Sequence, residues 1–180
     1  GRRARAFGMQ VIAFDPYLSD EQARARQIER VGLEELLRRS DVVSLHVPLT
    51  DSTAGMIGER ELAMMKPGAF LVNAARGGVV DEAALHRALV EGKLAGAALD
   101  VFEQEPLPAD HPLRKLDNVV LTPHLGAATE EAQQNVALEI AEAIRAALID
   151  GDYSRAVNAP ALGGEEMRRL RPVLDLSQRI

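Results

Sequence analysis

Short apolar runs recur along the 180-residue chain, and each is soon followed by a polar residue or a proline. Runs of this length, with little alternation between apolar and polar positions, are typical of parallel strands that helices cover on both faces. Proline stops a strand because it cannot donate to the ladder. We therefore predict strands over residues 10–14, 42–46, 69–73, 95–99 and 119–121.

Helical segments with recognisable ends separate these strands. Ser19, with Gln22 three residues later, fits a capping box, and Asp81 is placed to cap a helix that Gly92 ends. Strand starts fall roughly 25 residues apart, which leaves room for the helical crossover that parallel neighbours need. The predicted fold class is α/β, a doubly wound parallel sheet of the Rossmann type. Its helices are predicted over residues 19–27, 33–39, 58–65 and 82–91.

A longer helix follows, capped by Thr129 and ending near Asp150 and Gly151. Apolar residues at one-turn spacing predict a single buried stripe along it. Residues 157–162 then read as an extended connector, and residues 165–180 as a charged amphipathic helix. We predict a partial dinucleotide-binding domain over residues 1–156, and over residues 157–180 a segment that returns to a substrate domain or leads to a further domain. The stripe consists of Ala132, Val136, Ile140, Ile144 and Leu148.

Composition narrows the class of protein. The chain is 47% apolar and 27% charged, with a formal net charge of −6 and no dense basic block, which disfavours a nucleic-acid partner. No apolar run approaches the roughly 20 residues of a membrane helix, so no membrane partner is expected. The chain has no cysteine and no Cys/His cluster, which excludes a thiol nucleophile and gives no metal-site pattern. A cytoplasmic location fits this composition.

Three predicted strands end on groups that suit one reaction. Arg76 follows the strand over residues 69–73, Asp100 and Glu105 follow the next strand, and His124 follows the last. Because the carboxyl ends of parallel strands meet at one edge of a sheet, these side chains are expected to converge. An arginine, a carboxylate and a histidine at the ends of successive strands indicate a functional site, and all three groups suit one reaction.

A cofactor signal comes from Asp15, at the tip of the first predicted strand. An acid there can bind both hydroxyls of an adenosine ribose and favours NAD over NADP, but it can equally be a turn residue before Pro16. The glycine-rich phosphate loop should lie about 20 residues ahead of the acid, so the fold is expected to be truncated before its first strand. Asp100 likewise has two possible roles, as an acceptor for a nicotinamide carboxamide or as the cap of a local turn.

Four blocks of sequence together resemble the D-isomer-specific 2-hydroxyacid dehydrogenases. The blocks stand in the order and at the spacing of that family, and the resemblance extends over nearly the whole chain. The connector resembles that of its long phosphoglycerate-oxidising branch, which implies NAD-dependent oxidation of D-3-phosphoglycerate in serine biosynthesis. The blocks are His46-Val47-Pro48-Leu49-Thr50, residues 73–81, Leu99-Asp100-Val101-Phe102 with Glu105-Pro106, and residues 122–127.

The resemblance implies a role for each candidate residue. His124 would be the general base, Glu105 the carboxylate that orients it and supports its positive charge, and Arg76 the anchor for the substrate carboxylate. A small 2-hydroxy acid would be the substrate, and a homodimer or homotetramer is expected. We assign no catalytic role to His46, His86 or His111. The implied NAD-site residues are Asp15, Val47, Pro48, Ala74, Ala75, Arg76, Asp100, His124 and Gly126.

Two alternatives stay open on the sequence. One lies within the family, a reductase of glyoxylate or hydroxypyruvate, or a dehydrogenase for another D-2-hydroxy acid. The other belongs to a different class, an NAD-sensing corepressor or a dimerisation module without catalysis. The intact trio of Arg76, Glu105 and His124 favours an enzyme, since a scaffold does not need it.

Overall fold

Helices and strands alternate in the computed structural model, which describes residues 1–126, 128–157 and 169–170. Contacts within the chain divide it into two compact units, Gly1–Gly126 and Ala127–Ile180. The predicted boundary at residue 156 stays a prediction. Apart from residues 157, 169 and 170, the predicted connector and final helix lie outside the described residues.

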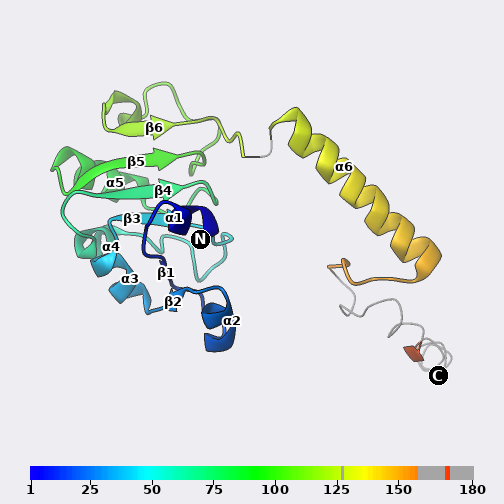
Figure 1. Cartoon of the computed structure of the whole chain (residues 1–180). Helices are drawn as coiled ribbons and strands as arrows, with labels where there is room; N and C mark the ends of the chain where they lie inside the picture. The colour runs from blue at the N-terminus through cyan, green and yellow to red at the C-terminus, as the bar shows by residue number, and fades with distance from the viewer. Residues whose placement is uncertain (127, 158–168, 171–180) are drawn as a thin grey trace. The chain divides into compact units, whose positions relative to one another are not determined.

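The strands of the first unit pair in parallel and place their carboxyl ends at a common edge. A four-stranded sheet has the order β3-β4-β5-β6, and the strands lie side by side in that order in Figure 1. A separate two-stranded sheet pairs β1 with β2. The predicted parallel α/β architecture is confirmed. The strands are β1 (Ile12–Ala13), β2 (Glu29–Arg30), β3 (Val42–Leu45), β4 (Ala69–Asn73), β5 (Leu94–Leu99) and β6 (Val119–Leu121).

Local sequence signals set most helix ends. The Ser19 hydroxyl accepts a hydrogen bond from the Gln22 amide and completes the expected capping box, while Asp81 and Thr129 cap their helices as predicted. Sequence reasoning missed α1, β2 and η1, which are short and carry no apolar period. The helices are α1 (Arg2–Ala6), α2 (Asp20–Ala25), α3 (Leu33–Arg39), α4 (Glu59–Met64), α5 (Glu82–Val90), the 3₁₀ helix η1 (Pro112–Lys115), α6 (Glu130–Arg145) and its π-helical end η2 (Ala146–Asp150).

The core of the first unit lies between one face of the sheet and helices α3, α4 and α5. Leu37, Leu62 and Leu85 of these helices pack with Leu71 of β4 and are almost fully buried. On the other face, β3, β4 and β6 expose an apolar side chain each. The sequence predicted helices on both faces of the sheet. In the described part of this unit, β3 and β4 instead alternate between buried and exposed positions. The exposed side chains are Val42, Phe70 and Val120.

The second unit corrects one prediction. Helix α6 has the expected apolar period, but none of its residues is buried. Val136, Ile140 and Ile144 expose 51%, 54% and 53% of their surface, so the predicted buried stripe is an exposed stripe in this structure. Periodicity identifies which face of a helix is apolar, whereas burial also needs a surface that covers it. The helix ends as expected at Gly151, which adopts the left-handed conformation.

Within the described residues, the helices are all too short or too polar to cross a membrane.

Candidate active site

The site lies where the loops follow the carboxyl ends of β3, β4, β5 and β6. Arg76 comes three residues after β4, Asp100 directly follows β5, and His124 comes three residues after β6. Glu105 lies in the longer loop between β5 and η1. The parallel order β3-β4-β5-β6 brings these loops to one edge, as the sequence predicted.

Glu105 and His124 form a direct pair, with 2.7 Å between Glu105 Oε2 and His124 Nδ1. The second carboxylate oxygen, Oε1, accepts a hydrogen bond from the Phe102 amide at 3.0 Å, which fixes the acid on its own loop. The hydrogen bonds to His124 and to the Phe102 amide hold the pKa of Glu105 below its usual value. Both side chains remain partly exposed, at 36% for Glu105 and 47% for His124, so a reactant can reach them.

His124 adopts a left-handed backbone conformation, with φ +55°. Such a conformation is uncommon for a residue other than glycine, and it often marks a functional position. The bond at Nδ1 assigns one ring nitrogen to Glu105. In the described part of the chain the other nitrogen, Nε2, has no hydrogen-bond partner, so it is available for proton exchange.

Asn73 organises the turn that carries Arg76, a role that sequence reasoning missed. Its side chain is only 2% exposed, accepts a hydrogen bond from the Ala75 amide at 3.1 Å and donates one to the Arg76 carbonyl at 3.0 Å. Its own carbonyl accepts a bond from the Asp100 amide at 2.9 Å, which joins the ends of β4 and β5. The sequence signal that could have identified this role is a polar asparagine as the last residue of an apolar strand.

Arg76 is exposed and presents most of its donors to solvent. Its Nη1 donates to the Ala75 carbonyl at 2.6 Å, and among the described residues it forms no ion pair with a carboxylate. No hydrogen bond joins it to Glu105 or His124 in that part of the chain. A guanidinium that carries five donors and is not neutralised by a neighbour can bind a ligand carboxylate.

Asp100 acts as a local cap in this structure. One oxygen accepts hydrogen bonds from the Thr122 hydroxyl and the Leu125 amide, and the other accepts one from the Gly126 amide. These bonds hold the pKa of Asp100 below its ordinary value, the Thr122 bond contributing most. Of the two roles that the sequence left open, the structure displays this one. A carboxylate has about four acceptor positions, so one remains for a nicotinamide amide.

Other predicted NAD-site residues lie in the loops that follow β1 and β3. Asp15 follows β1 and accepts a hydrogen bond from the Tyr17 amide at 2.8 Å through Oδ1, which is the geometry of a turn residue. Its exposed Oδ2 has no partner in the described part of the chain, so it can still accept bonds from ribose hydroxyls. Val47 packs against the core, and the Pro48 carbonyl accepts a bond from Thr53 at 2.6 Å.

The fit of these residues to NAD rests on their chemistry. Asp15 offers an acceptor for hydroxyls, and Ala74 and Ala75, next to β4, have the smallest side chains after glycine. Gly126 has no side chain to obstruct a ligand near Asp100. Carboxylate acceptors and small side chains in the loops that follow parallel strands are what a dinucleotide needs.

Fold and site together define an α/β dinucleotide-binding domain with a histidine–carboxylate pair. The family model of the D-isomer specific 2-hydroxyacid dehydrogenase, NAD binding domain, matches residues 1–126. The chain therefore belongs to the D-isomer-specific 2-hydroxyacid dehydrogenase family, and residues 1–126 are its NAD-binding domain.

Relatives with this domain differ in the substrates that their names state. D-3-phosphoglycerate dehydrogenase from Methanocaldococcus jannaschii is 47% identical over 178 residues, which are 98% of this chain and 34% of that protein. The crystal structure of a glyoxylate reductase from Paecilomyes thermophila is 43% identical with a TM-score of 0.75, over 83% of this chain and 45% of the other. A D-lactate dehydrogenase from Aquifex aeolicus, complexed with NAD and lactic acid, is 35% identical with a TM-score of 0.74, over 88% of this chain and 53% of the other. The chain thus spans about a third to a half of the length of these relatives.

Proposed function

We propose that this chain provides the NAD-binding and proton-transfer half of an enzyme that oxidises D-3-phosphoglycerate to 3-phosphohydroxypyruvate. The observation that carries the proposal is the 2.7 Å bond between Glu105 and His124, beside strand ends that suit NAD. The proposal extends to a small anionic hydroxy acid as the ligand, to a cytoplasmic location and to a homodimer or homotetramer.

His124 would take the proton of the substrate hydroxyl. With Nδ1–H donated to Glu105, Nε2 carries a lone pair and can accept that proton. The ring then becomes positively charged, and the ionised Glu105 stabilises that charge and keeps the ring in one orientation. The chemistry that bound NAD would supply is acceptance of the hydride from the carbon atom that bears the substrate hydroxyl. In the reverse direction His124 returns the proton to the carbonyl oxygen.

Arg76 would bind the carboxylate of the substrate. Its planar guanidinium can donate two parallel hydrogen bonds, which fix the position of the neighbouring hydroxyl-bearing carbon. Holding that carbon within reach of both the base and the cofactor is itself a large part of the rate enhancement. The buried Asn73 restricts the turn on which Arg76 lies, so less ordering is needed when substrate binds.

The choice of 3-phosphoglycerate rests on similarity to proteins of that name at 47% identity over nearly the whole chain. Glyoxylate reduction is the second candidate, because a glyoxylate reductase of known structure is 43% identical. Both reactions use the same pair and the same arginine. They differ in the group that follows the reacting carbon, a phosphorylated arm in one case and a hydrogen atom in the other.

Steady-state turnover of the full-length protein tests the proposal. We expect NAD-dependent oxidation of D-3-phosphoglycerate to have a higher kcat/KM than NADH-dependent reduction of glyoxylate. His124→Ala should lower kcat by about 10²–10⁴-fold, the usual contribution of a positioned base, without changing the Kd for NAD measured by calorimetry. His46→Ala is the matched control, because within the described residues the His46 ring hydrogen-bonds only to Ser44. Near-normal turnover of His124→Ala would refute the assignment of the base.

A further inference from the structure

The loop that carries Glu105 is largely exposed. Between the buried residues Phe102 and Leu113, most side chains face solvent, and only Leu107, Pro108 and His111 are partly buried. Such a loop buries little apolar surface, so its position depends on polar contacts with the rest of the domain.

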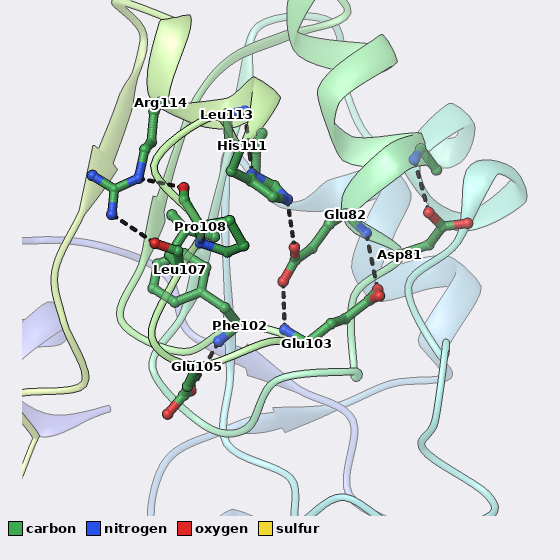
Figure 2. Close-up of polar contacts among 11 residues, drawn as sticks. Asp81, Glu82, Phe102, Glu103, Glu105, Leu107, Pro108, His111, Leu113 and Arg114 are labelled. Carbon is green, nitrogen blue, oxygen red and sulfur yellow. Dashed lines mark hydrogen bonds and ion pairs between the residues drawn. The ribbon is translucent and has the colours of Figure 1, made fainter.

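One carboxylate holds both ends of this loop. Glu82 Oε1 accepts a hydrogen bond from the Glu103 amide at 2.7 Å, and Glu82 Oε2 lies 3.1 Å from His111 Nε2. Figure 2 shows Glu82 between these two partners, with Glu105 on the same loop below them. The Glu82 and His111 side chains are only 12% and 21% exposed, so their contact is better protected from water than most ion pairs of this domain.

The hydrogen-bond directions are consistent with an ionised Glu82. His111 Nδ1 accepts a bond from the Leu113 amide at 3.4 Å, so the ring hydrogen lies on Nε2 and is donated to Glu82. Both Glu82 oxygens therefore accept from donors of the loop. No neutral side chain of the same size can accept at both positions, since an amide has one oxygen only.

The helix that carries Glu82 packs into the core. Glu82 lies in the first turn of α5, which Asp81 caps and which buries Ala84, Leu85, Ala88 and Leu89. The chain of contacts runs from this buried helix through Glu82 to the Glu103 amide. Two residues further on, Glu105 binds His124 Nδ1 at 2.7 Å.

We propose that Glu82 is a positioning residue that acts through Glu105 on His124. It holds the Glu103–His111 loop at the place where the Glu105 carboxylate meets the imidazole ring. The inference rests on the proposed function, because it matters for catalysis only if His124 exchanges a proton with substrate.

A double-mutant cycle in the full-length protein tests the inference. Glu82→Gln keeps the size of the side chain but loses one of the two acceptor positions. We expect it to lower kcat by about 10-fold and to leave the KM for NAD within about 2-fold, because a small displacement of an orienting group affects the chemical step. The double variant should have a kcat less than about 2-fold below that of Glu105→Gln alone. The reason is that the effect of Glu82→Gln passes through Glu105. Multiplicative effects of the two substitutions, or an unchanged kcat for Glu82→Gln, would overturn the inference.

A matched control and a second measurement separate this inference from the proposed function. Glu59 also contacts α5, through Arg87 at 3.0 Å. Among the described residues no hydrogen bond or ion pair joins it to the Glu105 loop, so Glu59→Gln should leave kcat unchanged. Hydrogen exchange at the Phe102 amide, which donates to Glu105, should become about 10-fold faster in Glu82→Gln and stay unchanged in Glu59→Gln. If the wild-type protein oxidises no hydroxy acid, the proposed function fails, while the exchange rates still decide whether Glu82 holds the loop.

Discussion

The contact between Gly77 and the Phe102 backbone gives the sharpest test of how the site is built. A Cβ atom added at Gly77 would lie 1.8 Å from the Phe102 carbonyl oxygen, 2.3 Å from its carbonyl carbon and 3.0 Å from the Glu103 nitrogen. All three are backbone atoms, so no side-chain rotation relieves the overlap. The substitution Gly77→Ala must therefore move the Phe102–Glu103 backbone by more than about 1 Å to reach ordinary contact distances.

The change in stability on Gly77→Ala follows from two opposing effects. Gly77 does not have the positive φ that disfavours alanine, so the change by itself would stabilise the fold by about 0.4–1 kcal/mol. Overpacking against rigid neighbours costs about 1–3 kcal/mol or more, and here the neighbour is the backbone of a buried residue. We expect a net loss near the upper end of that range, and a Tm for this domain lower by about 5–10 °C. Because the Phe102 amide holds Glu105, kcat should fall by up to about 10²-fold.

Thermal unfolding and steady-state turnover of the full-length protein measure both effects. Gly32→Ala is the control, since Gly32 has an ordinary φ of −72° and a Cβ there would meet no heavy atom within 4 Å. The free energy of unfolding of the Gly32→Ala variant should stay within about 1 kcal/mol of the wild-type value. A Gly77→Ala variant with wild-type Tm and kcat would show that the loop after β4 and the loop after β5 are not in contact. That result would refute this description of the site.

Three further outcomes are expected. Arg76→Lys should raise the KM for the hydroxy acid by about 10–100-fold, since a charge-assisted hydrogen bond is worth about 1.5–3 kcal/mol, and an unchanged KM would contradict the anchor role. The pKa of Asp100 is lowered in the folded state, so its contribution to stability is present above the ordinary aspartate pKa of about 3.9 and disappears as pH falls through the lower folded value. Asp100→Asn should therefore lower the Tm at pH 7 and reduce the loss of Tm on acidification, and parallel Tm curves for both proteins would refute this. Gly96→Ala places a Cβ 2.8 Å from the Asn118 carbonyl and should destabilise the domain by about 1–3 kcal/mol, which an unaltered denaturation midpoint would contradict.

Local chemistry made much of the fold predictable. The capping box at Ser19, the caps at Asp81 and Thr129, and the stop at Gly92 depend on residues within four positions of one another, so each can be recognised in the sequence. The parallel arrangement of the strands followed from their apolar character and spacing. The positions of Arg76, Glu105 and His124 in loops after the carboxyl ends of strands followed from that arrangement.

Other features escaped prediction because they depend on partners distant in sequence. The apolar face of α6 was recognised, but its exposure was not, since nothing in the period specifies what covers a face. Asn73 looked like the last residue of a strand, yet it holds the arginine turn and receives the Asp100 amide. Glu82 looked like an ordinary residue in the first turn of a helix, yet it bonds Glu103, 21 positions away.

The sequence by itself determined the class of fold, the edge of the sheet where the candidate site lies and the residue types predicted to act there. Those properties follow from the apolar periodicity, the helix caps and the spacing of the strands, which depend on residues close together in the sequence. Only the tertiary structure decided which atoms of Glu105 and His124 meet, that Asp100 caps the His124 loop and that Glu82 ties the Glu105 loop to a buried helix. Hydrogen bonds between loops depend on distances of a few tenths of an ångström, and packing of the whole domain sets those distances.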